Sequence, residues 1–153
     1  SLLAENNEIS VEQYIFFGFF IAFVFWIILK MFSFKDFIKG LILYDENSVY
    51  FNYESVSITS NEQSLISYLS ENPFITAPQV NRIISDQQYA KSHFTSLRNK
   101  LVMDLNKKLF ILTKKEKCII ETKLPKDNRL KAYKADSSII KRKISFFTFL
   151  FRN

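Results

Sequence analysis

An uncharged, apolar run near the N-terminus constrains this chain more than any other feature of its sequence. No residue between Tyr14 and Leu29 carries a charge, and the apolar character resumes after Lys30 and continues to Phe32. As a helix, residues 14–32 would cover about 28 Å, close to the hydrocarbon thickness of a bilayer. The run holds seven Phe and one Trp without a polar stripe, and a chain of 153 residues is too small to bury it. We therefore predict a single transmembrane helix over 14–32.

The residues on either side of this run predict its orientation. Glu5, Glu8 and Glu12 precede it without any Lys or Arg, whereas lysines follow it at positions 30, 35 and 39. Because positively charged flanks stay in the cytoplasm, we expect residues 1–13 to be a short extracytoplasmic segment and the remainder to be cytoplasmic, at a bacterial-type inner membrane. Since the sequence opens with Ser, we also expect a processed or partial chain that leaves room for an outer domain.

Three residues of the run are predicted to lie at the membrane interface. Tyr14 and Trp26 are amphipathic aromatic residues of the kind that anchor a span at the headgroups. Lys30 can extend its aliphatic stem and place its ammonium group among the headgroups. The lipid bilayer is accordingly the first expected partner.

Charge is distributed unevenly along the chain. Residues 1–90 contain four basic and ten acidic residues, whereas residues 91–153 contain seventeen basic and five acidic ones. Such an asymmetry indicates an anionic partner for the second half, either nucleic acid or the phospholipid surface. An ordinary solvated, lysine-rich surface explains the same composition equally well.

Residues that could carry chemistry are scarce. Cys118 is the only cysteine and His93 the only histidine, so neither an internal disulfide nor a four-ligand zinc site can form from them. Two glycines argue against a glycine-rich phosphate loop, and no nucleophile stands beside a base. We expect His93 on a helix surface and Cys118 in a core. We expect no catalytic residue, metal site, cofactor or small-molecule substrate, and hence no enzyme.

The middle of the chain follows the pattern of a small α+β domain. After a connector, alternating β-formers predict one or two short strands, and two capping boxes, Thr59 to Glu62 and Thr76 to Gln79, each begin a helix. A third helix and a basic hairpin follow. The expected ranges are 33–47 for the connector, 49–58 for the strands, 61–71, 77–84 and 89–108 for the helices, and 117–124 and 130–135 for the hairpin strands, with the turn at 125–129.

This order of elements is the layout of a winged helix-turn-helix. The predicted fold class is thus an α+β winged helix-turn-helix domain over 48–136, preceded by a single transmembrane α-helix and followed by a basic, aromatic tail over 137–153. In the third helix Phe94, Leu97, Leu101 and Leu105 form the core row, and short polar side chains framed by cations form the opposite face.

That polar face and the tip of the hairpin are the predicted DNA-binding surface, because hydroxyl and amide groups can read base edges while cations contact phosphates. The candidate residues are Lys91, Ser92, Thr95, Ser96, Arg98, Asn99 and Lys100 in the third helix, and Lys126 and Arg129 in the hairpin.

Two stretches carry a resemblance to a known family. The strand and Leu-rich helix over 56–73, and the Leu-Arg-x-Lys-Leu core within 94–101, make residues 56–109 resemble the effector domain of OmpR/PhoB-type response regulators. The Asp-x-Arg turn within 125–133 instead resembles the wings of MarR-type regulators. The resemblance implies a winged helix-turn-helix in which the third helix and the wing bind DNA. The glycine-containing wing end and the receiver domain of the OmpR type are absent from this sequence, so the resemblance does not imply control by phosphorylation.

Two functions follow as hypotheses. The first is a membrane-tethered, DNA-binding transcriptional regulator, an arrangement similar to ToxR-like activators with the opposite domain order. The alternative is a non-enzymatic structural or accessory subunit of a membrane complex, whose winged helix binds protein rather than DNA. The tail leaves its own alternatives open: a basic triplet over 141–143 precedes the apolar segment 144–151, which could lie on an anionic leaflet, pack on a partner protein or add a strand.

Overall fold

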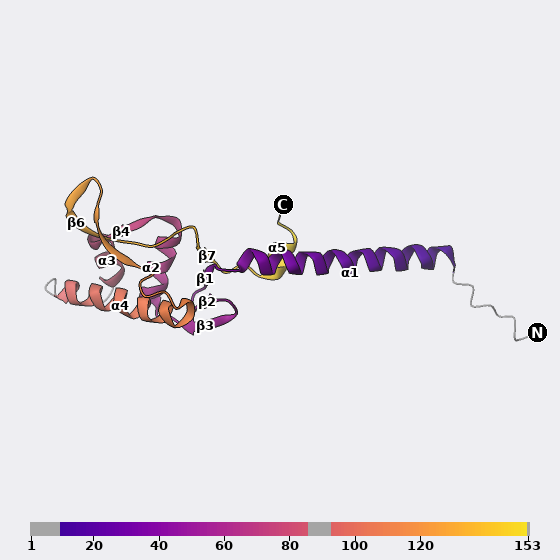
Figure 1. Ribbon diagram of the computed structural model, residues 1–153, viewed down its shortest axis with the longest axis horizontal. Coiled ribbons are helices and arrows are strands. Elements are labelled where there is room, and N and C mark those ends of the chain that lie inside the picture. The colour runs from indigo at the N-terminus through magenta and orange to yellow at the C-terminus, as the bar shows by residue number, and fades with distance from the viewer. Residues whose placement is uncertain (1–9, 86–92, 153) are drawn as a thin grey trace, which may run out of the picture. The chain divides into compact units, whose positions relative to one another are not determined.

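The computed structural model of the protein describes residues 10–85 and 93–152. The chain divides into two compact units (Figure 1). One, the helical unit, comprises residues 1–37 and 144–153, and the other, the α+β unit, comprises residues 38–143. An α+β unit after one long apolar helix agrees with the general fold class predicted from the sequence.

The helical unit is built on α1 (Val11–Ile38), which is long and apolar enough to cross a membrane. None of its residues is buried within the protein. The predicted apolar helix is therefore confirmed, but it continues beyond Phe32 into the predicted connector, because no Gly or Pro occurs between Phe32 and Gly40. Gly40 ends the helix with a φ of 75°, a left-handed conformation that glycine adopts without strain. The second element of this unit is α5 (Phe146–Leu150), and the Ser145 hydroxyl accepts a hydrogen bond from the Thr148 amide at 3.2 Å.

A four-stranded sheet opens the α+β unit. It consists of β1 (Ile42–Tyr44), β2 (Ser48–Phe51), β3 (Glu54–Ser57) and β7 (Ile140–Arg142), in the order β3-β2-β1-β7. The predicted strands over 49–58 are confirmed as the hairpin β2–β3, whose turn residues Asn52 and Tyr53 have φ values of 46° and 69°. The connector over 33–47 was a wrong prediction, because β1 lies within it and pairs with both β2 and β7.

Three helices follow this sheet: α2 (Ser60–Glu71), α3 (Ala77–Ile84) and α4 (Phe94–Thr113). Both predicted capping boxes form. The Thr59 hydroxyl accepts from the Glu62 amide at 3.3 Å, and the Thr76 amide donates to the Gln79 side chain at 2.9 Å. The third helix ends at Thr113 rather than at Lys108, because Leu109 and Leu112 continue its buried row.

A second sheet has the strand order β4-β6-β5, with both pairings antiparallel. Its strands are β4 (Phe74–Thr76), β5 (Ile120–Leu124) and β6 (Asp127–Lys134). The predicted hairpin is confirmed, but its turn is shorter than predicted because Leu124 already pairs with Asp127. Arg129 consequently lies in β6, whereas Lys126 lies in the turn.

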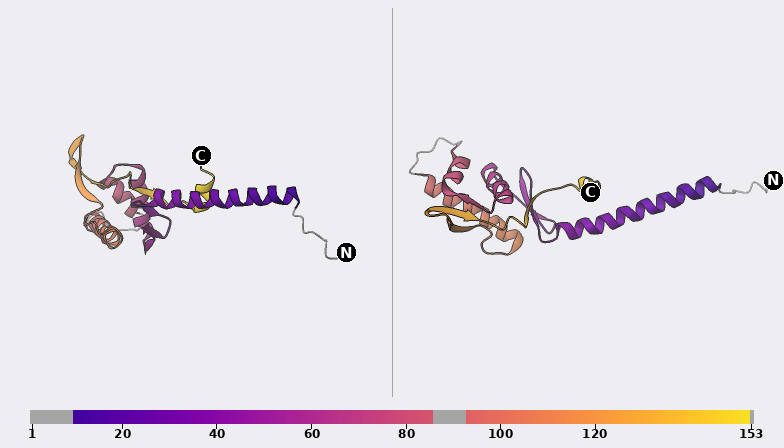
Figure 2. Two further views of the ribbon diagram at one scale, coloured as in Figure 1. Left: turned by 45° about the vertical axis from the view of Figure 1, so that its right-hand side comes forward. Right: turned by 90° about the horizontal axis from the view of Figure 1, so that it is seen from above.

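The three helices and both sheets lie together in the α+β unit (Figure 2). One hydrophobic core joins them. Its fully buried members come from every layer of the unit: Ile42, Val49, Leu65, Ile66, Leu69, Ile75, Val80, Leu105, Leu109, Tyr133 and Ile140. Ile42 and Ile140 are each only 1% exposed and lie outside the predicted bounds of 48–136. The compact domain is therefore 38–143, and part of the predicted tail belongs to it as strand β7.

Candidate nucleic-acid interface

Helix α4 presents the predicted polar face to the outside of the α+β unit. Leu101 and Leu105 hold the helix against the core, being 9% and 0% exposed, and Phe94 and Leu97 pack on the same core while staying partly exposed. Because 3.6 residues complete a turn, the opposite face projects outward. The exposed polar residues of that face are Thr95, Ser96, Asn99 and Lys100. The predicted Lys91 and Ser92 lie outside the described residues.

Arg98 is a correction to the predicted set. Its side chain is 8% exposed, and its guanidinium donates from Nε to the Tyr133 hydroxyl at 3.2 Å and from NH1 to the Asn81 side-chain oxygen at 2.9 Å. Both donors point inward to β6 and α3, so the side chain is unavailable to a phosphate. Arg98 instead ties α4 to the neighbouring helix and to the hairpin.

The hairpin β5–β6 carries the other predicted cations. Lys126 in the turn and Arg129 in β6 are both exposed, and the Arg129 amide donates to the Asp127 carboxylate at 3.0 Å. Three further lysines, Lys123, Lys131 and Lys134, belong to the same hairpin, and Lys131 forms an ion pair with Glu121 at 3.0 Å. The hairpin is thus basic at its tip and partly neutralised nearer its base.

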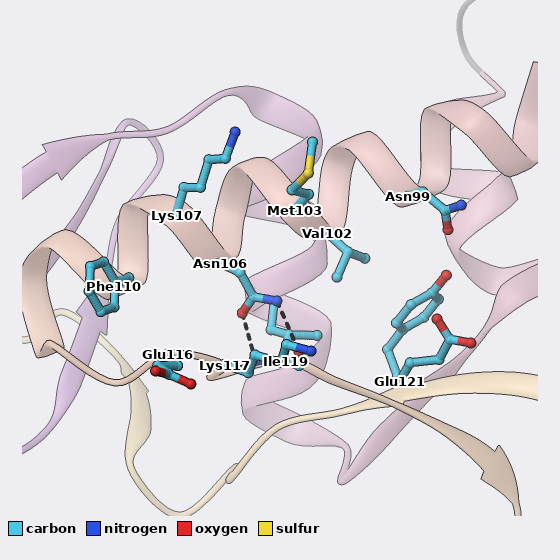
Figure 3. A pocket seen from close by; sticks show the side chains of 11 residues that line it. Asn99, Val102, Met103, Asn106, Lys107, Phe110, Glu116, Lys117, Ile119 and Glu121 are labelled. Atoms are coloured by element: carbon cyan, nitrogen blue, oxygen red, sulfur yellow. Dashed lines mark hydrogen bonds between the residues drawn. The ribbon is translucent and has the colours of Figure 1, made fainter.

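A groove of about 510 Å³ separates α4 from the hairpin (Figure 3). Asn99 and Met103 of α4 line it from one side, and Glu121 and Tyr133 from the other. Asn106 fixes the separation, because its amide donates to the Ile119 carbonyl at 2.9 Å and accepts from the Ile119 amide at 2.8 Å, as Figure 3 shows. The sequence analysis missed Asn106, since nothing in the local pattern signals a partner thirteen residues away.

The groove also has an apolar component that the sequence analysis did not single out. Met103 is 51% exposed and Phe110 45% exposed, on a helix whose other apolar residues mostly face the core. Both side chains line the groove, with Lys107 between them in sequence. The exposed surface of α4 therefore offers polar groups from Thr95 to Lys100 and apolar side chains at Met103 and Phe110.

The three predicted membrane-interface residues all lie on α1. Tyr14 is 63% exposed and Trp26 38% exposed. Trp26 and Lys30 are one turn apart, and the Lys30 ammonium lies 6.0 Å from the Trp26 ring centroid. Tyr14 lies twelve residues before Trp26 and takes no part in the contact between Trp26 and Lys30. Their placement at a membrane interface stays a prediction.

Groups with catalytic or ligating potential are separated in space. Among residues 10–85 and 93–152, no cluster of three or more His, Cys, Asp or Glu side chains could hold a metal ion. His93 is exposed, and Cys118 is buried with its sulfur 3.6 Å from the Thr113 hydroxyl. The buried carboxylate of Glu62 is engaged by Lys108 at 2.7 Å and by the capping box.

Comparisons with protein-family models, curated proteins and solved structures find no match to this chain. Any function must therefore be inferred from its own residues and geometry.

Proposed function

We propose that this protein is a membrane-anchored, DNA-binding transcriptional regulator whose α+β unit is a winged helix-turn-helix domain. The observation that carries the proposal is that α4 has an exposed polar face, of which Asn99 lines a groove whose other side is the hairpin β5–β6, and that this hairpin exposes Lys126 and Arg129 at its tip. A helix with a neighbouring hairpin matches the dimensions of a major groove and its flanking backbone.

The topology of the second sheet supports the winged-helix assignment. Chain order runs α2, β4, α3, α4, β5, β6, and β4 closes the sheet on β6. In winged helix-turn-helix domains the third helix enters a groove and the hairpin, or wing, touches the flanking backbone. By this correspondence α4 is the recognition helix and β5–β6 is the wing. The resemblance of 56–109 to OmpR/PhoB-type effector domains points the same way.

Each exposed residue then has an expected role. The Asn99 amide can donate to and accept from a base edge, and the hydroxyls of Thr95 and Ser96 can do either. Lys100, Lys126 and Arg129 would contact phosphates, which position the domain without reading sequence. Arg98 acts indirectly, by holding α4 against the wing.

Membrane anchoring is the second half of the proposal. Helix α1 would cross the bilayer, and the lysines after it would keep the α+β unit in the cytoplasm of a bacterial-type cell, where it can reach DNA. A tether raises the local concentration of the domain near the inner leaflet and restricts binding to DNA that approaches the membrane.

Duplex binding by the full chain in a neutral detergent tests the proposal. We expect Asn99→Ala to weaken binding to a preferred sequence by about 1–3 kcal/mol, with little effect on unrelated duplexes. Lys100→Ala should weaken binding to all duplexes alike. The matched control is Lys115→Ala, an exposed lysine outside the α4–hairpin surface. Equal, undetectable binding by the wild type and all variants at low salt would overturn the proposal.

The exposed apolar residues of α4 favour one second candidate. Phe110 and Ile111 are 45% and 54% exposed, which suits a domain that binds protein within a membrane complex. In that case a detergent pull-down would yield a stoichiometric partner that resists nuclease, and Phe110→Ser would release it while Asn99→Ala would not.

A further inference from the structure

The C-terminal helix α5 packs against the last turns of α1 within the helical unit. The ring of Phe34 lies 5.5 Å from that of Phe146 and 5.2 Å from that of Phe149, and Phe37 lies 5.5 Å from Phe149. Three aromatic contacts of this length fix α5 to the end of α1 that leads into the α+β unit.

The length of α1 sets the level of this contact in a bilayer. Its 28 residues cover about 42 Å, which exceeds a hydrocarbon core of about 30 Å by roughly two turns. If residues 14–32 fill the core, the remaining turns, which carry Phe34 and Phe37, emerge among the headgroups. Helix α5, held by those two residues, would then lie at the headgroup level as well.

One aromatic face of α5 has no partner among the described residues. Phe147 and Phe151 are 71% and 69% exposed, and their rings meet edge to face with centroids 5.3 Å apart. Phe146 and Phe149, by contrast, are partly covered by α1. Exposed phenyl rings are unfavourable in water and favourable at the boundary between headgroups and acyl chains.

Cations surround this aromatic cluster. The Lys30 ammonium lies 5.8 Å from the Phe149 ring, and the Arg152 guanidinium lies 5.6 Å from the Phe37 ring. Lys35 and one carboxylate, Asp36, are exposed on the same end of α1, and no acidic residue occurs in 144–153, so the site carries three cations and one acidic group. Cations interleaved with aromatic rings match a surface of anionic phosphate groups above an apolar layer.

We infer that α5 and the last two turns of α1 form a binding site for the anionic phospholipid surface. This inference rests on the proposed membrane anchoring by α1. It gives the α+β unit two attachments to the bilayer, because α1 leads into β1 through residues 39–41 and β7 leads into α5 through residues 143–145. Since β1 and β7 are neighbouring parallel strands, both attachments leave from one pair of strands.

Tryptophan fluorescence of the full chain in vesicles tests this inference. Trp26 is the only tryptophan, so in the wild type it reports on α1, and the double variant Trp26→Phe/Phe147→Trp reports on α5 alone. Vesicles would contain lipids brominated along the acyl chains, either as phosphatidylcholine alone or mixed with phosphatidylglycerol. We expect the introduced tryptophan to be quenched in the mixed vesicles, at a depth of about 5–10 Å below the headgroups.

Two further variants make the test specific. Adding Lys35→Gln and Arg152→Gln to the reporter should reduce the quenching in mixed vesicles to the level in phosphatidylcholine. In the matched control, Trp26→Phe/Leu130→Trp, the reporter sits in the hairpin and should stay accessible to aqueous acrylamide.

Four results would overturn the inference. Quenching at Trp26 without quenching at position 147 would leave membrane anchoring intact and refute the α5 site. Equal quenching with and without phosphatidylglycerol would refute recognition of anionic headgroups. Protection of position 147 from both bromine and acrylamide would assign the face to a protein partner. Equal lipid quenching at position 130 would show that contact is not local to α5.

Discussion

At the scale of single residues, Arg98 ties α4 to the hairpin β5–β6 and to α3. A guanidinium that is 8% exposed must have its donors engaged, and here the hydroxyl of Tyr133 and the amide oxygen of Asn81 accept from it. These two acceptors belong to the hairpin and to α3. Arg98 therefore helps to set the orientation of α4 relative to both elements, together with the Asn106–Ile119 bonds and the leucine row.

Replacing Arg98 should destabilise the α+β unit more than it affects any surface contact. We expect Arg98→Met to lower the free energy of unfolding by about 2–3 kcal/mol, because two bonds to a charged donor are lost and the Tyr133 hydroxyl stays buried without its donor. As a control, Lys100→Met at an exposed position nearby should change the free energy of unfolding by less than about 0.5 kcal/mol. Urea unfolding of the full chain in detergent measures both. Unchanged stability with lost duplex binding would contradict the structural role and favour a contact with DNA.

Asp45 makes the stability of the fold depend on pH. The Tyr50 hydroxyl donates to its carboxylate at 2.7 Å, and this bond, with weaker help from the Asn47 and Ser48 amides and from Lys143, lowers the pKa of Asp45 below 3.8 despite some desolvation. A carboxyl whose pKa falls on folding stabilises the folded state above its unfolded pKa and loses that contribution as the pH falls through the folded value.

Tyr50→Phe should therefore weaken the fold at neutral pH and flatten its loss of stability in acid. The matched control is Tyr53→Phe, since that tyrosine is 74% exposed in the next turn. Urea midpoints from neutral pH to below 3.8 provide the measurement. If the stability of Tyr50→Phe fell in acid as steeply as that of the wild type, the bond to Asp45 would not be the cause.

These residues show what a sequence can and cannot predict at this scale. The exposure of Thr95, Ser96, Asn99 and Lys100 was predictable, because helical periodicity places them opposite a leucine row. The burial of Arg98 was not, because it depends on a tyrosine thirty-five residues away in sequence. The same limit hid the pairing of Asn106 with Ile119.

At the scale of elements, α2 and α4 are joined by one buried ion pair. The Lys108 ammonium lies 2.7 Å from a Glu62 oxygen, and their side chains are 27% and 3% exposed. Glu62 also closes the capping box with Thr59 at the start of α2. One carboxylate thus caps the start of α2 and also holds α4 against it.

Removing the lysine should cost more than removing the cap. Lys108→Met leaves a buried carboxylate without its counter-charge and should destabilise the unit by about 3 kcal/mol, whereas Thr59→Ala should cost about 1 kcal/mol. Lys107→Met is the control, since its neighbouring ammonium is exposed. Thermal unfolding of the three variants would rank them. A smaller effect for Lys108→Met than for Thr59→Ala would contradict the role of the ion pair.

Local signals explain which elements the sequence predicts. Capping boxes act over three residues, and both form where expected. Strands β1, β4 and β7 have three residues each, too few for alternation to be recognised, and each is held by a partner distant in sequence, as in the pairing of Ile42 with Ile140. Helix α4 ends at Thr113 rather than at the predicted Lys108, because Leu109 and Leu112 extend its buried row.

At the scale of the whole molecule, the compact α+β unit, residues 38–143, is larger than the range 48–136 predicted for the domain. Strands β1 and β7 contribute Ile42, Tyr44 and Ile140 to the core, with exposures of 1%, 4% and 1%. The general class, an apolar helix followed by a small α+β domain, was predictable from hydropathy and periodicity. The domain bounds were not, since they depend on pairing between the two ends of the domain.

A fragment of residues 38–143 should accordingly unfold cooperatively, whereas 48–136 should not. The shorter fragment loses three buried side chains of the core and leaves the β2 edge unpaired. Circular dichroism during urea titration compares them. Equal midpoints for the two fragments would show that the four-stranded sheet adds nothing to the stability of the domain.

The salt dependence of duplex binding by the full chain, in nanodiscs of neutral lipid, tests the central claim most directly. Each phosphate contact contributes a slope of about −0.9 to log K against log salt concentration. We predict a linear fall for the wild type, and a slope smaller in magnitude by about 3 when Lys100, Lys126 and Arg129 are all replaced by Ala. Failure to bind duplex at low salt, or an unchanged slope in that variant, would contradict a DNA-binding surface formed by α4 and the hairpin.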